Sequence, residues 1–197
     1  NQYYVKKADD DNNVYLVSST SIEPFMGTLY DFAESGTFPS VTSATITDVK
    51  VDKENSYELT QDADNLFWNV SDGKTTEKAD TTKAGTVTSA IGSLAYDKFV
   101  DYNCTDDSKY GFDDPYAVIT VKYTEEEQET QTVEKTLTIY VGDETGDDRY
   151  VKVDDSKEVY TITKDSLTDI LDSTMSDFYN LTVSYVSSND LDSLEVQ

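Results

Sequence analysis

The amino-acid sequence predicts an α+β fold in which amphipathic helices pack on antiparallel sheets, built from a duplicated β-hairpin–helix unit. Apolar residues alternate with polar ones over several short stretches, as in strands that bury one face. Elsewhere they recur at intervals of three and four residues, as in amphipathic helices. Strands come in runs with a helix after each run, and this order favours antiparallel sheets over strict βαβ alternation.

The stretch from Arg149 to Phe178 has a counterpart at the start of the chain. The sequence Tyr-Val-Lys occurs at residues 4–6 and again at 150–152, and Val-Tyr recurs at an offset of 145 residues. Further apolar positions recur at that offset: Val17 and Ile162, Ile22 and Leu167, Phe25 and Ile170, Met26 and Leu171, and the set Phe38, Val41, Ile46, Val49, Val51 with Val183, Val186, Leu191, Leu194, Val196. Any hairpin followed by a helix shares part of this pattern, but the shared Tyr-Val-Lys and Val-Tyr pairs favour an internal repeat.

The repeat predicts a division of the chain into three parts. Residues 1–38 are expected to be the hairpin and helix at the tail of a preceding repeat unit. Residues 39–180 form one complete unit, made of a meander, a helix, hairpins and a second helix, and residues 181–197 begin a following unit. Both ends of the chain thus fall inside units, and the first residue is not Met, so we expect a piece of a longer protein.

The first hairpin is predicted at residues 3–7 and 13–17, with Asp9–Asn13 as its turn because Asp and Asn tolerate turn dihedrals. One apolar stripe defines the helix that follows: Ile22, Phe25, Met26 and Leu29. Pro24 is compatible with this helix only in its first turn.

Alternating residues from Thr45 to Val70 predict a three-stranded meander, in which Trp68 shares the core side with Leu66 and Val70. The charged stretch Ser71–Lys83 has no apolar anchors and is predicted to be a mobile loop. A second amphipathic helix is defined by a further apolar stripe: Val87, Ala90, Ile91, Leu94 and Ala95.

The stretch Lys109–Tyr123 begins with Tyr110-Gly111-Phe112, predicted to be a turn packed by its own aromatic rings, and Pro115 then opens a strand. Glu125–Glu129 is predicted to be an acidic hairpin tip, and the return strand Thr132–Val141 ends in Gly142-Asp143. The repeated hairpin follows, with a last helix whose apolar face is Leu167, Ile170, Leu171, Met175 and Phe178.

Charge and composition exclude several classes of function. Forty acidic residues against fifteen basic ones give a formal net charge of −25, which repels nucleic acids and anionic membrane surfaces. The chain has no histidine, so Ser/His/Asp and Cys/His catalytic arrangements cannot form. Cys104 is the only cysteine, so neither an internal disulfide nor a thiol cluster for zinc is possible, and it has no base or cationic neighbour in sequence to activate it.

Three constellations remain as candidate sites. Asp113-Asp114 are the best-placed carboxylates for a hydrolase, but capping a turn ahead of a strand explains them better. Acidic clusters occur at three predicted turns: Asp9–Asp11, Asp143 with Asp147-Asp148, and Asp154-Asp155. None follows the calcium-binding EF-hand loop, so no metal or cofactor is predicted, and calcium at one of these turns stays an open alternative. Aromatic residues form the candidate binding surface, namely Trp68, Tyr110 and Tyr116, although Trp68 also fits a core anchor.

Several of these motifs occur in an order that resembles the bacterial domain-of-unknown-function family 4340. The motifs are Tyr110-Gly111-Phe112-Asp113-Asp114-Pro115, Val141-Gly142-Asp143, Tyr150-Val151-Lys152 and Val159-Tyr160. The resemblance covers about residues 40–180 and implies an extracytoplasmic protein of the lipoprotein or membrane-anchored type. Some members look to be encoded beside ABC transporters. The resemblance brings no catalytic residues, and an anchor would lie in a segment absent from this chain.

These observations favour a non-enzymatic extracytoplasmic scaffold or binding module with a protein partner at the cell envelope, associated with a transporter. The alternative is a solute- or glycan-binding domain serving a transporter, in which Trp68 and exposed tyrosines would line a cleft. A carboxylate-based hydrolase is the third and weakest reading.

Overall fold

The computed structural model describes residues 1–180 except 11, 34, 63–66 and 128–130. Within these residues the fold is α+β, with one nine-stranded antiparallel sheet whose strand order is β6-β5-β4-β3-β8-β9-β10-β11-β7. The strands are β3 (Ile46–Asp52), β4 (Tyr57–Gln61), β5 (Trp68–Ser71), β6 (Thr76–Ala79), β7 (Phe99–Asp101), β8 (Ala117–Glu127), β9 (Gln131–Thr145), β10 (Asp148–Val153) and β11 (Val159–Thr163). The prediction of an α+β fold with antiparallel sheets is therefore confirmed.

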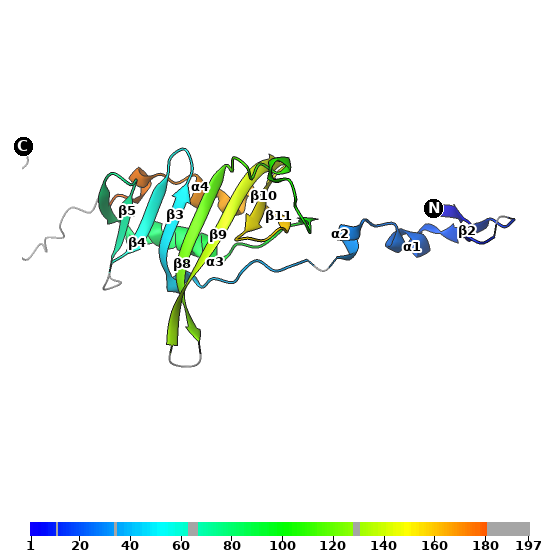
Figure 1. Cartoon of the computed structure of the whole chain (residues 1–197), viewed down its shortest axis with the longest axis horizontal. Coiled ribbons are helices and arrows are strands. Elements are labelled where there is room, and N and C mark those ends of the chain that lie inside the picture. The colour runs from blue at the N-terminus through cyan, green and yellow to red at the C-terminus, as the bar shows by residue number, and fades with distance from the viewer. Residues whose placement is uncertain (11, 34, 63–66, 128–130, 181–197) are drawn as a thin grey trace, which may run out of the picture.

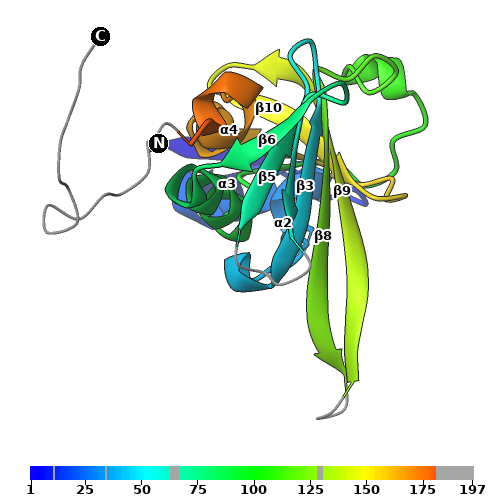
Figure 2. The same ribbon diagram turned by 90° about the vertical axis from the view of Figure 1, so that its left-hand side faces the viewer.

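Two helices, α3 (Thr81–Gly92) and α4 (Lys164–Leu171), cover one face of the sheet (Figures 1 and 2). The main core lies between them and the inward side chains of the strands, because alternate residues of a strand point to the same face. Fully buried core residues include Val49, Ile119 and Ile139 from the strands and Ile91 and Ile170 from the helices. Asp80 begins α3 as its N-cap, and its carboxylate accepts hydrogen bonds from the amides of Thr82 and Lys83.

The N-terminal segment extends away from this sheet, beyond its β7 end (Figure 1). It contains a two-stranded hairpin, β1 (Gln2–Val5) and β2 (Tyr15–Ser18), and the short helical elements α1 (Ser19–Ile22), η1 (Glu23–Phe25) and α2 (Leu29–Phe32). We call residues 2–32 the N-terminal hairpin–helix and residues 148–171 the C-terminal hairpin–helix.

The two hairpin–helix segments have the same strand register. Tyr4 faces Leu16 and Val5 faces Tyr15 in the first, and Tyr150 faces Thr161 and Val151 faces Tyr160 at the corresponding positions of the second. In each segment the helix begins directly after the second strand of the hairpin, α1 after β2 and α4 after β11. The N-cap of α1 has φ −59° and ψ 139°, and that of α4 has φ −63° and ψ 141°.

Three short 3₁₀ elements complete the fold: η2 (Ser43–Thr45), η3 (Asp107–Lys109) and η4 (Met175–Phe178). The predicted meander is confirmed as β3, β4 and β5, although Leu66 lies outside the described residues. The prediction of a mobile loop at Ser71–Lys83 is wrong, because this stretch contains β6 and the first turn of α3. Strand β6 was missed because three of its four residues are exposed and an edge strand needs no apolar alternation.

Three other expectations need correction. The apolar stripe from Ile22 to Leu29 does not form one continuous helix, since α1 ends at Ile22 and a 3₁₀ turn containing Pro24 follows it. Strand β9 runs through Gly142-Asp143 to Thr145 instead of ending there. The predicted acidic tip is largely strand as well, because β8 continues to Glu127, while residues 128–130 lie outside the described part.

The β8–β9 hairpin projects below the body of the sheet as a two-stranded ribbon (Figures 1 and 2). The last pairing of β8 with β3 is at Tyr123, so the residues beyond it pair only across the ribbon, from Thr124 with Glu134 to Glu127 with Gln131. We call residues 124–127 and 131–134 the acidic ribbon.

Candidate functional site

The motifs behind the family resemblance meet at one place. Tyr110-Gly111-Phe112 packs against Gly142-Asp143 of β9, and the amide of Asp143 donates a 2.9 Å hydrogen bond to the carbonyl oxygen of Tyr110. Gly111 has φ +75°, a left-handed conformation that favours glycine. A Cβ atom on Gly142 would overlap the carbonyl oxygen of Tyr110. Glycine at both positions therefore allows two backbone segments to approach closely.

A second hydrophobic cluster surrounds this contact on the face of the sheet opposite α3 and α4. Its buried members come from the connection between β7 and β8 and from β11, and partly buried residues of β7, β9 and β10 pack against them: Cys104, Tyr110, Phe112 and Val159, with Val100, Tyr140 and Tyr150. The rings of Tyr110 and Tyr150 meet edge-on with centroids 4.9 Å apart. The predicted aromatic turn is thus a small core of its own, and its packing explains the motif residues structurally.

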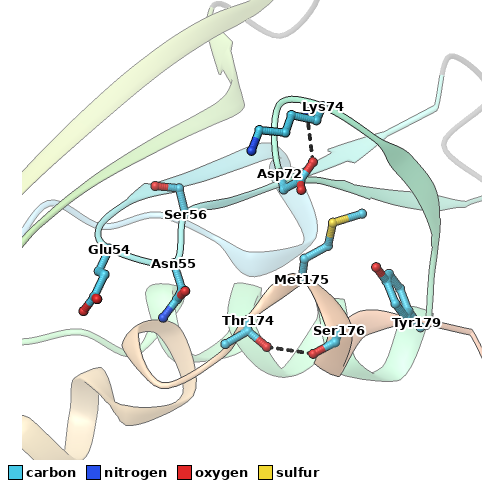
Figure 3. A pocket seen from close by; sticks show the side chains of 9 residues that line it. All are labelled: Glu54, Asn55, Ser56, Asp72, Lys74, Thr174, Met175, Ser176 and Tyr179. Atoms are coloured by element: carbon cyan, nitrogen blue, oxygen red, sulfur yellow. Dashed lines mark hydrogen bonds between the residues drawn. The ribbon is translucent and has the colours of Figure 1, made fainter.

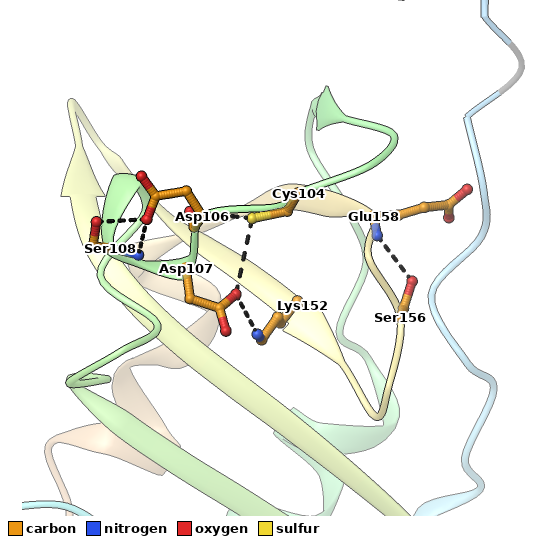
Figure 4. A network of polar contacts seen from close by, with 7 residues as sticks. All are labelled: Cys104, Asp106, Asp107, Ser108, Lys152, Ser156 and Glu158. Atoms are coloured by element: carbon orange, nitrogen blue, oxygen red, sulfur yellow. Dashed lines mark hydrogen bonds and ion pairs between the residues drawn. The ribbon is translucent and has the colours of Figure 1, made fainter.

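Polar contacts close the cluster at its margin (Figure 4). Lys152 Nζ lies 2.7 Å from Asp107 Oδ1 and also stands over the rings of Phe112 and Tyr140, at 5.0 and 5.4 Å from their centroids. Cys104 Sγ lies 3.4 Å from the carbonyl oxygen of Asp106. The ammonium group is thus held by a carboxylate and two aromatic faces, and the thiol is buried, so this arrangement stabilises the fold.

An open hollow of about 550 Å³ lies at the opposite end of the sheet, between the β3–β4 turn, the β5–β6 turn and η4 (Figure 3). Its lining is mostly polar: Glu54, Asn55, Ser56, Asp72, Lys74, Thr174, Met175, Ser176 and Tyr179. Asp72 Oδ1 accepts hydrogen bonds from the amides of Lys74 and Thr75, which lower the pKa of this carboxyl group. Thr174 Oγ1 donates to Asp177 Oδ2 at 2.7 Å. These hydrogen bonds stabilise the turns to which Asp72 and Thr174 belong.

The three aromatic residues of the predicted binding surface do not share one surface. Trp68 is 7% exposed in β5 and belongs to the main core, and Tyr110 is 3% exposed in the second cluster, where its hydroxyl donates to Asp101 Oδ2 at 2.9 Å. Tyr116 is 48% exposed. Of the three, only Tyr116 presents its ring to a ligand in this conformation. A binding role for the other two stays a prediction that their burial does not favour.

A smaller hollow of about 210 Å³ lies beside Tyr116, between the adjoining ends of β9 and β10 and helix α4. The guanidinium carbon of Arg149 stands 3.6 Å from the centroid of the Tyr116 ring. Glu144 bridges two cations, with Oε1 2.7 Å from Arg149 Nη2 and Oε2 3.2 Å from Lys164 Nζ. The hydrogen bond and charge of Lys164 lower the pKa of Glu144. The sequence reading missed this cluster, although Arg149 is the only arginine of the chain.

The remaining predicted sites are placed as follows. Asp113 and Asp114 are both exposed in the loop ahead of β8. Within the described ranges, no group of three or more Asp, Glu and Cys side chains is arranged to hold a metal ion. Asp11 of the first acidic turn lies outside those ranges. No helix in the described part of the chain is long and apolar enough to cross a membrane.

Comparison with known families shows what this chain is similar to. Two overlapping stretches, residues 1–115 and residues 68–197, match the family described as Domain of unknown function (DUF4340). The chain belongs to this family. No curated protein and no solved structure matches the DUF4340 chain. The family description carries no activity, so a function has to be argued from the residues themselves.

Proposed function

We propose that this DUF4340 chain is a non-enzymatic, extracytoplasmic scaffold or binding module built from a duplicated hairpin–helix unit, with a protein partner at the cell envelope. Residues 1–38 are the tail of a preceding unit, residues 39–180 are one complete unit, and residues 181–197 begin the next. The module is anchored to the membrane through a segment outside this chain and works beside a transporter. The motif order that resembles the family supports the location and the anchor.

The observation that carries the proposal is the relation between the two hairpin–helix segments. They share four strand pairs in the same register and the same N-cap conformation, and their sequences share the Tyr-Val-Lys and Val-Tyr pairs. Repeat proteins stack such units so that each covers the apolar face of its neighbour. A chain built in this way presents an elongated surface, which suits a scaffold.

The end of the N-terminal hairpin–helix and the residues that follow it are attached to the complete unit. The ring of Tyr30 meets that of Phe99 edge-on at 5.5 Å, and the amide of Gly36 donates a 3.1 Å hydrogen bond to the hydroxyl of Tyr160. Aromatic pairs of this kind contribute on the order of 1 kcal/mol beyond the area they bury. These contacts hold the preceding segment beside the β7 edge, and they support a defined arrangement of successive units.

The acidic ribbon is the surface we assign to the protein partner. A two-stranded ribbon alone is marginally stable in water, so contact with a partner would stabilise it. Glu126 and Glu134 are exposed on it, and Glu125 pairs with Lys135. The negative charge fits a basic partner surface, since complementary potentials favour the encounter of two proteins.

Affinity capture from envelope extracts, with identification of the captured protein, tests this assignment. The native chain and a variant with Asp113→Lys and Asp114→Lys should capture the same partner. A variant with Glu126→Lys and Glu134→Lys should lose it, although both variants change the net charge equally. Equal capture by both variants would rule out the ribbon as the binding surface. Turnover of a substrate that depends on Asp113 or Asp114 would overturn the non-enzymatic assignment.

A second candidate function is solute binding at the hollow beside Tyr116. The exposed ring and the cations of Arg149 and Lys164 are groups that hold a sugar or a small carboxylate. A thermal-shift screen with sugars, small carboxylates and peptides decides between the two functions. A stabilising ligand whose effect disappears in Tyr116→Ala would favour solute binding.

A further inference from the structure

The N-terminal hairpin–helix exposes an unusual number of large apolar side chains. Soluble proteins rarely leave a contiguous patch of such side chains in water unless it is an interaction site. Tyr4 and Phe25 are 81% and 80% exposed. The other exposed members are Tyr3, Val14, Tyr15, Leu16, Met26, Leu29 and Phe32.

The C-terminal hairpin–helix shows what covers the corresponding positions. Phe25 and Met26 correspond to Ile170 and Leu171, which are buried in the main core beside α3. Val14 corresponds to Val159, which is buried in the second cluster on the other face of the sheet. Strand β9 pairs with the outer edge of β10, and α3 packs against α4. In the N-terminal hairpin–helix, no described strand pairs with the outer edge of β1.

The geometry points to one occupant for this surface. We propose that residues 2–32 complete a preceding unit of the same family, so that β1 pairs with a strand equivalent to β9 and the residues from Ser19 to Phe32 pack on a helix equivalent to α3. This inference rests on the proposed tandem arrangement and adds the partner surface to it. The occupant supplies a strand edge on one side and an apolar helix face on the other.

A second copy of this chain fits the surface less well. Its own β9 edge is already paired with its β10, and its own α3 is already packed against its α4. A second copy therefore has no vacant position of the required kind. A preceding unit has such a vacant position beside its equivalent of β9. In the complete unit β9 leads into β10 through a two-residue connection, residues 146–147, and β1 would follow the preceding unit's strand in the same way.

The test supplies the missing elements from this chain itself. Residues 39–146 are placed directly before Asn1 of the full chain, so that β1 follows a β9 strand as β10 does in the complete unit. Hydrogen–deuterium exchange is then measured for the amides of β1 and β2 in the full chain and in the extended chain. We expect exchange to slow by about 100-fold or more in the extended chain, because covered strands exchange only through larger opening events.

A matched control separates docking from a general effect of added length. Phe25→Asp places a charge where docking would bury it, so the extended chain with this variant should lose the protection. The same variant should leave exchange in the unextended chain unchanged, because Phe25 is exposed there.

Three results would overturn the proposal. The first is fast amide exchange of β1 and β2 in the extended chain. The second is failure of the added residues to fold, since the N-terminal hairpin–helix should complete their fold. The third is a dimer of the unextended chain by sedimentation that Phe25→Asp abolishes, which would make a second copy the occupant. Enzymatic turnover or loss of partner capture would overturn the proposed function without changing the exchange result.

Discussion

The hydroxyl group of Tyr57 donates a 2.8 Å hydrogen bond to the carbonyl oxygen of Ile170, and it joins the second strand of the meander to the last turn of α4. Tyr57 is almost fully buried, and its burial raises the pKa of the phenol. Nearby, Lys53 Nζ donates to the carbonyl oxygens of Leu171 and Ser173, and burial lowers the pKa of this amine. The end of α4 is thus satisfied by residues more than a hundred positions earlier in the chain.

Tyr57→Phe tests this connection. The variant keeps the ring and its packing but leaves the Ile170 carbonyl without this donor, so we expect the free energy of unfolding to fall by about 1–2 kcal/mol. Denaturant unfolding measures the change. Tyr116→Phe is the control, because its exposed hydroxyl should contribute nothing measurable, and an equal loss in both variants would contradict the assignment.

Gly142→Ala tests the close approach of the two family motifs. The added methyl group overlaps the carbonyl oxygen of Tyr110, which belongs to backbone and cannot turn aside, so we expect a loss of about 3 kcal/mol. Gly85→Ala is the matched control in α3. Nothing lies within 4 Å of the new methyl group there, and helix propensity predicts a gain of about 0.5–1 kcal/mol. Thermal unfolding of both variants checks the opposite signs.

The ion pair between Lys98 and Asp148 predicts a pH dependence of stability. Lys98 Nζ lies 2.7 Å from Asp148 Oδ2, and this hydrogen bond is the largest cause that lowers the pKa of Asp148 and raises that of Lys98. A carboxyl group with a lowered pKa stabilises the fold above its ordinary pKa near 4, and the contribution is lost as the pH falls through the lowered value. The amine contributes below its ordinary pKa near 10, and this contribution is lost as the pH rises through the raised value.

Asp148→Asn should therefore reduce stability at neutral pH and flatten the acid side of the stability curve. Urea unfolding between pH 2 and pH 7 measures both effects. An unchanged slope below about pH 4 would show that Asp148 contributes nothing to the acid sensitivity of the protein.

Substitution by alanine at the corresponding positions Ile170 and Phe25 should change the free energy of unfolding by unequal amounts. Ile170→Ala opens a cavity in the main core and is expected to cost about 2–5 kcal/mol. Phe25→Ala removes a side chain that is already exposed, so we expect a change within about 0.5 kcal/mol. Unfolding of the full chain measures both, and a large loss with Phe25→Ala would mean that this side chain is covered in solution.

Many elements of residues 39–180 were predictable because their side chains obey the period of the element that they form. The meander was predicted correctly from alternating apolar positions, and the existence of α3 and α4 from apolar residues at helical spacing. Both helices are shorter than predicted, because α3 ends at Gly92 before Leu94 and Ala95, and α4 ends at Leu171, so that Met175 and Phe178 lie in η4. Trp68 packs in the main core, which was one of its two interpretations. Strand β6 was not predictable in this way, because its pairing with β5 depends on backbone hydrogen bonds and not on apolar side chains.

The residues of the candidate site were harder to predict from the sequence. Tyr110 and Tyr116 have the same chemistry, yet one is packed in the second cluster and the other is exposed beside Arg149. The hollow beside Tyr116 is assembled from the loop before β8, the adjoining ends of β9 and β10, and α4. Only the arrangement of these segments in space brings its charges together.

By itself the sequence determined the periods of the strands and helices, the negative charge, the absence of histidine chemistry and the recurrence of one hairpin–helix pattern. Only the tertiary structure decided which of the two patterns is covered. The reason is physical: an apolar stripe specifies a face that prefers burial, but burial requires a neighbouring surface. In this chain β9 and α3 supply that surface to the C-terminal hairpin–helix, which leaves the N-terminal one exposed.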